Sequence, residues 1–333
     1  MRRSRLLRAL LVTAAAAGVA ALLVFRGPDW GAVGHSLRQM SWSWALAAVG
    51  INLASALVRG LAWQTVVRQA IPPPHPRTLD LFSAFFVGIF ANGVLPGRVG
   101  EVVRVGVLVR RRPGGRPLWP PLLGSVVAHR LLEIFPSIGL IVWVLAAAKI
   151  PGWGRTSLLA VLALAIVVFV LGLLLARRYE HGEIPGAGRV RAVLAHVREG
   201  LGVLRRPWPA AQAVALQTAA WTLQLGAVWT AMRAFHISVP IAAAAAVLAL
   251  MNVALILPLW PGNVGLQQAA IALPLVPYGV PYAHGFAYGI GLQAIESSVG
   301  YVGGLVFLLR EGLSLGGLRR LGETGSTGSG PGC

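Results

Sequence analysis

Long apolar segments, separated by short polar and basic segments, dominate the chain. An α-helix needs roughly 20 apolar residues to cross a bilayer. The pattern predicts about six full crossings by this criterion, over residues 6–25, 42–66, 122–148, 157–176, 209–232 and 282–309. The first segment is interpreted as an uncleaved crossing rather than a signal peptide, because no polar cleavage region separates it from its flank. Trp42, Trp44 and Trp63 are placed like interfacial anchors of the second crossing.

Two further apolar segments are interrupted by similar Pro-Gly sequences. Residues 79–109 contain Pro96-Gly97-Arg98-Val99-Gly100-Glu101, and residues 241–276 contain Pro261-Gly262-Asn263-Val264-Gly265-Leu266. Proline lacks a backbone donor and glycine adopts backbone angles that other residues avoid, so each sequence breaks a helix. The legs on either side are too short to cross the membrane. We therefore predict two re-entrant helical hairpins, whose structural breaks are Pro96, Gly97, Gly100, Pro261, Gly262 and Gly265.

The two halves of the chain compare as inverted repeats. Repeat A covers about residues 6–148 and repeat B about residues 157–310. Each repeat consists of two crossings, then a hairpin, then a third crossing. With the amino terminus in the cytoplasm, most basic residues fall in cytoplasmic segments, as the positive-inside rule requires. Residues 1–310 are thus expected to form one transmembrane domain, with both termini cytoplasmic. Inverted repeats with broken helices are typical of transporters.

Composition agrees with an all-α polytopic membrane protein. Of the 333 residues, 56% are hydrophobic and 12% are charged. The formal net charge of +19 is explained by basic segments between crossings, so no nucleic acid partner is expected. A single cysteine, Cys333, excludes a disulfide framework, and the histidines show no metal-ligand spacing. Neither a metal nor a cofactor is therefore predicted.

Two hydrophilic segments lie outside the crossings. Residues 177–208 combine apolar positions at helical spacing with arginines, which predicts an amphipathic helix on the membrane surface. Residues 311–333 are rich in glycine and serine and are expected to form a disordered cytoplasmic tail.

Ionisable residues within apolar segments are the first candidates for a binding site, because each costs a few kcal/mol or more in hydrocarbon. They usually face a cavity or one another. In the first half they are Arg98, Glu101, Arg104, Arg130 and Glu133, and in the second half Glu296. The alternative is a structural network, for example Arg130 with Glu101, that holds the first hairpin. Arg59 lies near the inner interface, where its side chain can extend to the headgroups.

Amide side chains form the second group of candidates. Asn92, Asn263 and Gln268 lie beside the breaks, and Gln293 precedes Glu296 by one helical turn. These amides can contact a ligand or satisfy backbone groups freed by the breaks. Gln217, Trp221 and Gln224 share one helix face and are interpreted as helix-packing residues.

Three sequences together resemble the transmembrane domain of bacterial lysylphosphatidylglycerol synthases and the related flippase-like membrane proteins. They are residues 92–104, His129-Arg130-Leu131-Leu132-Glu133, and residues 257–265. Two positions depart from that family pattern, which leads us to expect Glu where Gln268 stands and Arg where Gln293 stands. No part of the chain resembles the soluble aminoacyl-transferring domain of the synthases.

The resemblance implies a protein of the bacterial plasma membrane that handles lipids. The expected function is a flippase or scramblase for a phosphate-bearing lipid, with or without an aminoacyl group. One alternative is an accessory to cell-envelope synthesis that handles polyprenyl-phosphate-linked sugars beside a separate lipid synthase or glycosyltransferase. Another is a membrane enzyme acting on lipid headgroups. It is not favoured, because the acids are accompanied by arginines and no nucleophile or pair of free carboxylates stands out.

Overall fold

The protein is helical throughout the part that the structure describes. The computed structural model describes residues 28–95, 99–111, 118–178, 206–256, 263, 265–314 and 316–318. No strand occurs in these ranges, which confirms the all-α class. The helices are α2 (Trp30–Arg38), α3 (Trp42–Ala70), α4 (Thr78–Val94), α5 (Gly100–Arg110), α6 (Trp119–Ala147), α7 (Gly152–Arg178), α9 (Pro207–Ala234), α10 (Ile241–Ile256), α11 (Leu266–Ala272), the 3-10 helix η3 (Leu273–Tyr278) and α12 (Tyr282–Arg310).

Three helices, α3, α6 and α12, are long and apolar enough to cross a membrane, and each has 29 residues. Shorter apolar helices are α4, α10 and the described part of α7. The predicted crossing over residues 6–25 and most of the predicted surface helix lie outside the described residues. The short helix α2 was not anticipated. Its N-cap is Asp29, whose carboxylate accepts hydrogen bonds from the amides of Gly31 and Ala32 at 2.8 and 3.1 Å.

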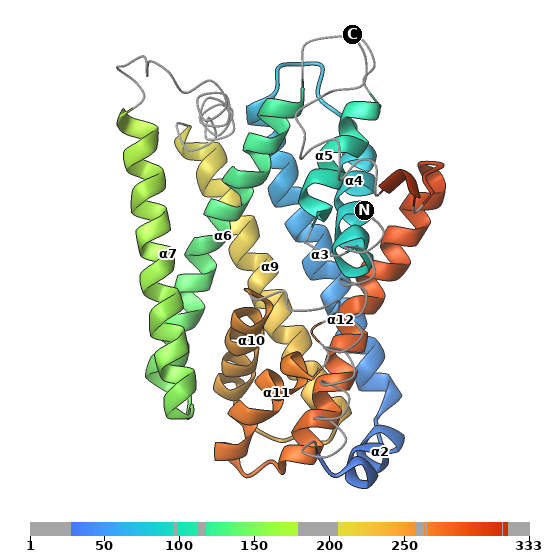
Figure 1. The fold of residues 1–333 in the computed structure, drawn as a ribbon, viewed down its shortest axis with the longest axis vertical. Coiled ribbons are helices and arrows are strands. Elements are labelled where there is room, and N and C mark those ends of the chain that lie inside the picture. The colour runs from blue at the N-terminus through green and yellow to red at the C-terminus, as the bar shows by residue number, and fades with distance from the viewer. Residues whose placement is uncertain are drawn as a thin grey trace, which may run out of the picture.

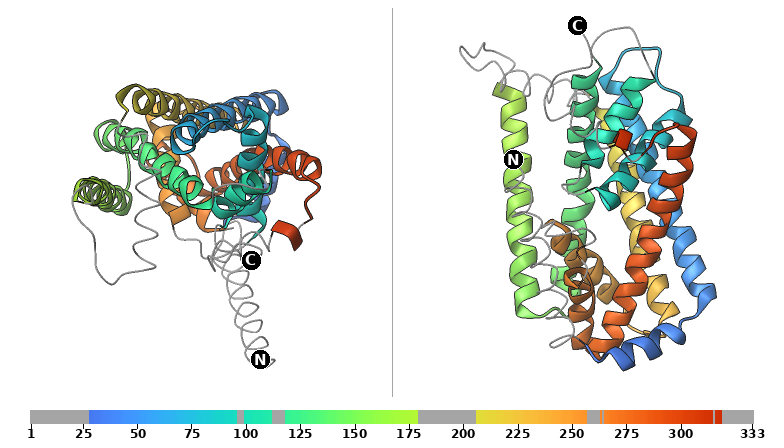
Figure 2. Two further views of the ribbon diagram at one scale, coloured as in Figure 1. Left: turned by 90° about the horizontal axis from the view of Figure 1, so that it is seen from above. Right: turned by 45° about the vertical axis from the view of Figure 1, so that its right-hand side comes forward.

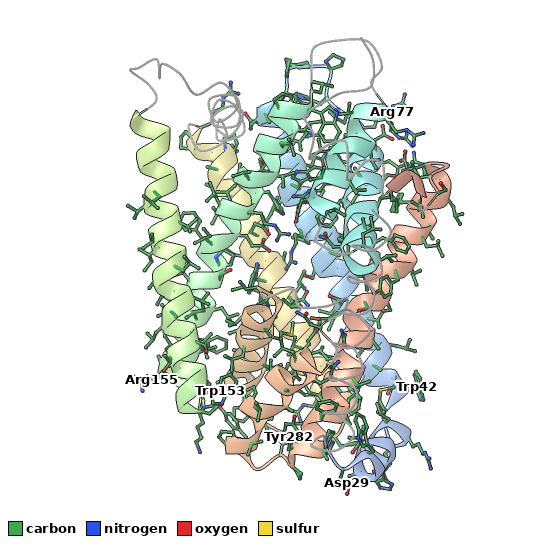
Figure 3. The ribbon with its side chains drawn as sticks, in the orientation of Figure 1. Asp29, Trp42, Arg77, Trp153, Arg155 and Tyr282 are labelled. Atoms are coloured by element: carbon green, nitrogen blue, oxygen red, sulfur yellow. The ribbon has the colours of Figure 1, made fainter. Side chains whose placement is uncertain are left out.

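The long helices form a bundle with distinct short helices at its two ends (Figure 1). Helices α4 and α5 lie toward one end, and α10 and α11 lie toward the other. Figure 3 places Arg77 at the first end, and Asp29, Trp42, Trp153, Arg155 and Tyr282 at the second. Helix α7 lies at the edge of the bundle (Figure 2). Each predicted break therefore separates two short helices at one end of the bundle.

The two largest of four apolar cores in the described residues occupy the two ends of the bundle. One joins α4 and α5 to α3, α6 and the second half of α12. The other joins α10, α11 and η3 to α9, the start of α3 and the first half of α12. Helices α3 and α12 contribute to both cores. Polar side chains in the middle of the long helices consequently lie between two apolar regions.

Glycines let α12 approach a short helix at each end. A Cβ at Gly285 or Gly289 would meet the backbone of α11 at 3.1 Å, and one at Gly304 would meet α4 at Phe90 Cβ, 2.3 Å away. Gly300 likewise faces Ile89 of α4. The spacing of these glycines favours packing from the sequence alone, and the structure confirms it.

Trp63 differs from its expected place. Trp42 and Trp44 are exposed, as interfacial anchors would be, whereas Trp63 is fully buried. Its indole donates to Ser125 Oγ of α6 at 3.3 Å, and its ring lies 4.7 Å from the Arg104 guanidinium. Interfacial placement is therefore wrong for Trp63, because its indole N–H finds a partner within the protein.

The end of α12 is attached to α4 and α5 by charged side chains. Arg111 donates to Asp80 at 2.8 Å and to Glu311 at 2.9 Å, and Glu311 also accepts from Ser83. Hydrogen bonding to Glu311 raises the pKa of the Arg111 guanidinium. Leu313 and Leu318, within the segment expected to be a tail, pack against the core around α4 and α5.

Candidate functional site

Five charged side chains from three helices meet inside the bundle, and we call them the arginine–glutamate cluster. They are Arg59 of α3, Glu101 and Arg104 of α5, and Arg130 and Glu133 of α6. Arg130 pairs with Glu133 at 2.7 Å and also with Glu101. Arg104 Nη2 lies 2.5 Å from Glu101, and Arg59 Nε lies 3.9 Å from Glu133. The cluster thus connects α6 to both α5 and α3.

The arginines of the cluster differ in how far they are buried. The Arg104 side chain is 5% exposed and is held between Glu101 and the ring of Trp63. The Arg130 side chain is 54% exposed and that of Arg59 28% exposed. Arg104 is therefore positioned by its neighbours, whereas Arg130 and Arg59 can reach an additional group.

The described cluster contains more positive than negative charge. Three guanidinium groups face two carboxylates, because Arg59, Arg104 and Arg130 share Glu101 and Glu133. Arg59 Nε, although buried, has no hydrogen-bond partner among the described residues. A guanidinium group can bind two oxygens of a carboxylate or phosphate at once. The excess positive charge of the cluster is therefore suited to binding one anion. Arg98, which was also predicted to belong here, lies outside the described residues.

A second polar group joins α3, α9 and α12, and we call it the amide network. Gln224 of α9 donates to Glu296 Oε1 of α12 at 2.6 Å. Ser55 of α3 lies 3.3 Å from Gln224 Oε1 and donates to the carbonyl of Ala220 at 2.8 Å. Asn52 Nδ2 lies 3.4 Å from the Glu296 carbonyl. Glu296 is thus held by neutral groups, in contrast to Glu101 and Glu133.

The remaining amides contact the backbone around the breaks. Asn92 of α4 accepts a hydrogen bond from the amide of Gly100 at 2.8 Å, and Gln268 accepts one from the amide of Gly265 at 2.6 Å. Asn263 donates to the carbonyl of Ala254 at 3.3 Å. These contacts satisfy backbone groups that a helix break exposes. Of the break residues, Pro96, Gly97, Pro261 and Gly262 lie outside the described residues.

Gln268 has a second contact that links α11 to α12. Its side-chain amide donates to Gln293 Oε1. The contact corresponds to the Arg130–Glu101 pair, which links α5 to α6. The second half thus has a neutral amide pair where the first half has an ion pair.

The charged groups lie at the middle of the long helices. Arg130 and Glu133 occupy the same positions in α6 as Gln293 and Glu296 occupy in α12. Because α6 and α12 both have 29 residues, Glu133 and Glu296 are the middle residues of their helices. If these helices cross the membrane, both acids lie near the centre of its hydrocarbon region.

A surface cleft of about 900 Å³ lies apart from these groups, between the end of α3 and the start of α4. Its basic lining residues are Arg68, His75, Arg77 and Arg206, and it includes no member of the cluster or the amide network. Within the described residues no group of His, Cys, Asp or Glu side chains is arranged to hold a metal ion.

Sequence reasoning did not assign Arg59 and Gln224 to the site. A sequence pattern that could have indicated both is polar residues at helical spacing. Arg59 shares a helix face with Asn52 and Ser55, and Gln224 shares one with Gln217. Gln217 lies within 3.3 Å of both ring nitrogens of His129, beside the cluster. Which helices these faces meet depends on packing between distant parts of the chain.

Comparison with known proteins identifies a family for this chain. The sequence model of the family described as lysylphosphatidylglycerol synthase TM region matches residues 6–303. No curated protein and no solved structure matches the chain. The match spans both Pro-Gly breaks, the arginine–glutamate cluster and Glu296. The chain therefore belongs to the family of lysylphosphatidylglycerol synthase transmembrane regions, and is a membrane protein of a family tied to lipid handling.

Proposed function

We propose that this protein moves a phosphate-bearing lipid, such as phosphatidylglycerol or its aminoacylated form, between the leaflets of a bacterial plasma membrane. The observation that carries the proposal is the arginine–glutamate cluster, in which three guanidinium groups share two carboxylates where the start of α5 meets the middle parts of the apolar helices α3 and α6. Charges at that depth are costly and usually mark a substrate path. An anionic headgroup would balance the excess charge.

The proposed topology has six crossings and two re-entrant hairpins in inverted repeats, with both termini cytoplasmic. Three observations support it. Helices α4 and α5 lie at the opposite end of the bundle from α10 and α11 (Figure 1). The pairs Arg130/Glu133 and Gln293/Glu296 occupy equal positions in helices of equal length. Helix α12 contacts α4 as α6 contacts α10. Hairpins entering from opposite faces would give both leaflets access to the middle of the bundle.

In this mechanism the arginines of the cluster have different roles. Arg130 and Arg59, the more exposed pair, bind the phosphate oxygens of the headgroup. Arg104 is a positioning residue, because Glu101 and Trp63 hold it. Glu101 and Glu133 fix the guanidinium groups in place and compete with the phosphate, so that the headgroup can be released. The acyl chains remain in the lipid throughout.

Transport is proposed rather than chemistry on the headgroup, because both acids of the cluster pair with arginine. A carboxylate held by a guanidinium is a weak general base. Asn92, Asn263 and Gln268 are assigned to holding the two breaks, since each bonds to backbone there.

The test is leaflet exchange of fluorescent phosphatidylglycerol in proteoliposomes, measured by quenching of the outer-leaflet probe. We expect Arg130→Lys and Arg59→Gln to slow exchange about tenfold or more, because a charge-assisted hydrogen bond contributes about 1.5–3 kcal/mol. Lysine keeps the positive charge at position 130 but cannot bind two phosphate oxygens in the bidentate way that a guanidinium group can. Arg155→Gln, at the exposed end of α7, is the matched control (Figure 3).

Exchange at the wild-type rate by both variants would contradict the proposal. A polyprenyl-phosphate probe in the same vesicles tests the alternative substrate class. Faster movement of that probe than of phosphatidylglycerol would favour a role beside a glycosyltransferase.

A further inference from the structure

Glu296 stands apart from the other acids inside the bundle. Glu101 and Glu133 each lie within ion-pair distance of arginines. Within the described chain no arginine, lysine or histidine lies within ion-pair distance of Glu296. Among the described residues, the side-chain amide of Gln224 donates to Oε1 of Glu296 at 2.6 Å. A carboxyl group at the middle of an apolar helix is therefore held by a neutral partner.

The surroundings favour a neutral carboxyl over a carboxylate. An ionised carboxylate away from water needs a cation or several donors, and otherwise binds a proton. Ser55 lies against the carbonyl oxygen of Gln224, so that the amide nitrogen of Gln224 faces Glu296. One neutral donor is too little to compensate for the loss of water around a full negative charge.

Few charged or titratable groups act on Glu296. Arg59 of α3 acts on it electrostatically. The hydroxyl of Tyr288, two turns earlier on α12, donates to the carbonyl of Val228 instead. Helix α9 contributes the Gln224 amide and α11 contributes neutral side chains. Side chains on α2, α4 and η3 that carry titratable groups lie near the helix ends or are engaged elsewhere: His35, Arg38, Asp80 and Tyr278. Arg59 is therefore the charge that decides whether Glu296 ionises.

Arg59 also belongs to the arginine–glutamate cluster. It lies 3.9 Å from Glu133, which Arg130 already contacts at 2.7 Å. The positive charge of Arg59 is thus incompletely balanced. Arg59 also lies one turn after Ser55 on α3, and Ser55 contacts the Gln224 amide that holds Glu296. Arg59 connects the cluster of the first half to the acid of the second half.

We propose that Glu296 is a proton-binding site coupled to the anion site through Arg59. This inference rests on the proposed function. An anionic headgroup on Arg59 and Arg130 balances the charge that would otherwise stabilise ionised Glu296. Binding of the headgroup therefore draws one proton from water onto the Glu296 carboxylate, and release of the headgroup returns that proton. Linkage is reciprocal, so a protonated Glu296 also strengthens headgroup binding.

The consequence is that lipid movement responds to a proton gradient. Anion and proton occupy the protein together and leave together. A lipid with one negative charge would cross with its charge neutralised. The chain would then have an energy source without a nucleotide site.

The experiment uses the full chain in detergent and has two readouts. The first is the infrared carbonyl band of protonated carboxyl groups at neutral pH, recorded before and after phosphatidylglycerol is added. The second is proton uptake from weakly buffered solution when phosphatidylglycerol is added, with phosphatidylcholine as the neutral comparison. Glu296→Gln removes the titratable group and keeps its shape. Asp29→Asn is the matched control, since asparagine is an equally good N-cap at this surface position.

We expect the wild-type protein to show a partial protonated band without lipid, and the band to grow as protons are taken up with phosphatidylglycerol but not with phosphatidylcholine. Glu296→Gln should lose both signals while still binding phosphatidylglycerol, and Asp29→Asn should keep both. A band that persists in Glu296→Gln, or its absence from the wild type, would overturn the inference. Lipid binding without proton uptake by the wild type would also overturn it and would leave the proposed function standing. Failure of the wild type to bind phosphatidylglycerol would count against the proposed function and the coupling, whatever the infrared band shows.

Discussion

Glu133 and Glu296 are the middle residues of two helices of equal length, yet their partners differ in charge. Arg130 contacts Glu133 at 2.7 Å, whereas Gln224 contacts Glu296 at 2.6 Å. The same contrast recurs one turn earlier, where Arg130 pairs with Glu101 and Gln293 with Gln268. Equivalent positions of α6 and α12 thus contribute to an ionic site in the first half and to a neutral site in the second half.

The ion pair between Glu101 and Arg130 links α5 to α6, as the neutral pair of Gln268 and Gln293 links α11 to α12, so we expect a neutral pair to be tolerated in the first half as well. We expect Arg130→Gln alone to destabilise the protein by about 1–3 kcal/mol, because Glu101 and Glu133 lose a cation. Adding Glu101→Gln should recover part of that loss while lipid exchange stays low. Thermal unfolding in detergent measures the first effect and the proteoliposome assay the second. A double variant no more stable than the single one would contradict this expectation.

Gly100 is expected to be intolerant of any side chain. A Cβ there would lie 2.0 Å from the carbonyl oxygen of Gly88 and 2.6 Å from the Asn92 amide that accepts from its backbone. Since a backbone carbonyl cannot move aside freely, Gly100→Ala should separate α4 from α5 at a cost of about 1–3 kcal/mol. Gly139→Ala, in α6 with open space around it, is the control and should be neutral or slightly stabilising. Equal melting temperatures for the two variants would refute the close approach of α4 and α5.

The long apolar helices and both breaks were predictable because their signals are local. Apolar segment lengths indicate α3, α6 and α12, and each Pro-Gly sequence breaks a helix by the backbone chemistry of its own residues. Four cluster members were predictable because a charge inside an apolar segment is conspicuous. The contribution of Arg59 and the burial of Trp63 were not, since both depend on how α3 packs against α5 and α6.

Arg111 is expected to stabilise the attachment of α12 to α4 and α5 in a salt-dependent way. The raised pKa of Arg111 means that its contribution is complete below the usual arginine pKa and would be lost only at a higher pH than normally used. Salt is therefore the better probe. Arg111→Gln should cost up to about 1 kcal/mol at low ionic strength, and less at high ionic strength, because its contacts are partly exposed. The neighbouring exposed Arg110→Gln is the control. A loss for Arg111→Gln that does not change with salt would argue against an ionic contribution.

Gln293→Arg would give Glu296 the partner that Glu133 already has. Arginine at position 293 stands one turn before Glu296, as Arg130 stands before Glu133. We expect the new cation to stabilise the ionised carboxylate, so that the protonated infrared band is lost without any change at position 296. Gln293→Met, which removes the contact with Gln268 but adds no charge, should keep the band. If Gln293→Arg also keeps it, the charge environment does not control the proton at Glu296, and the coupling through Arg59 loses its physical basis.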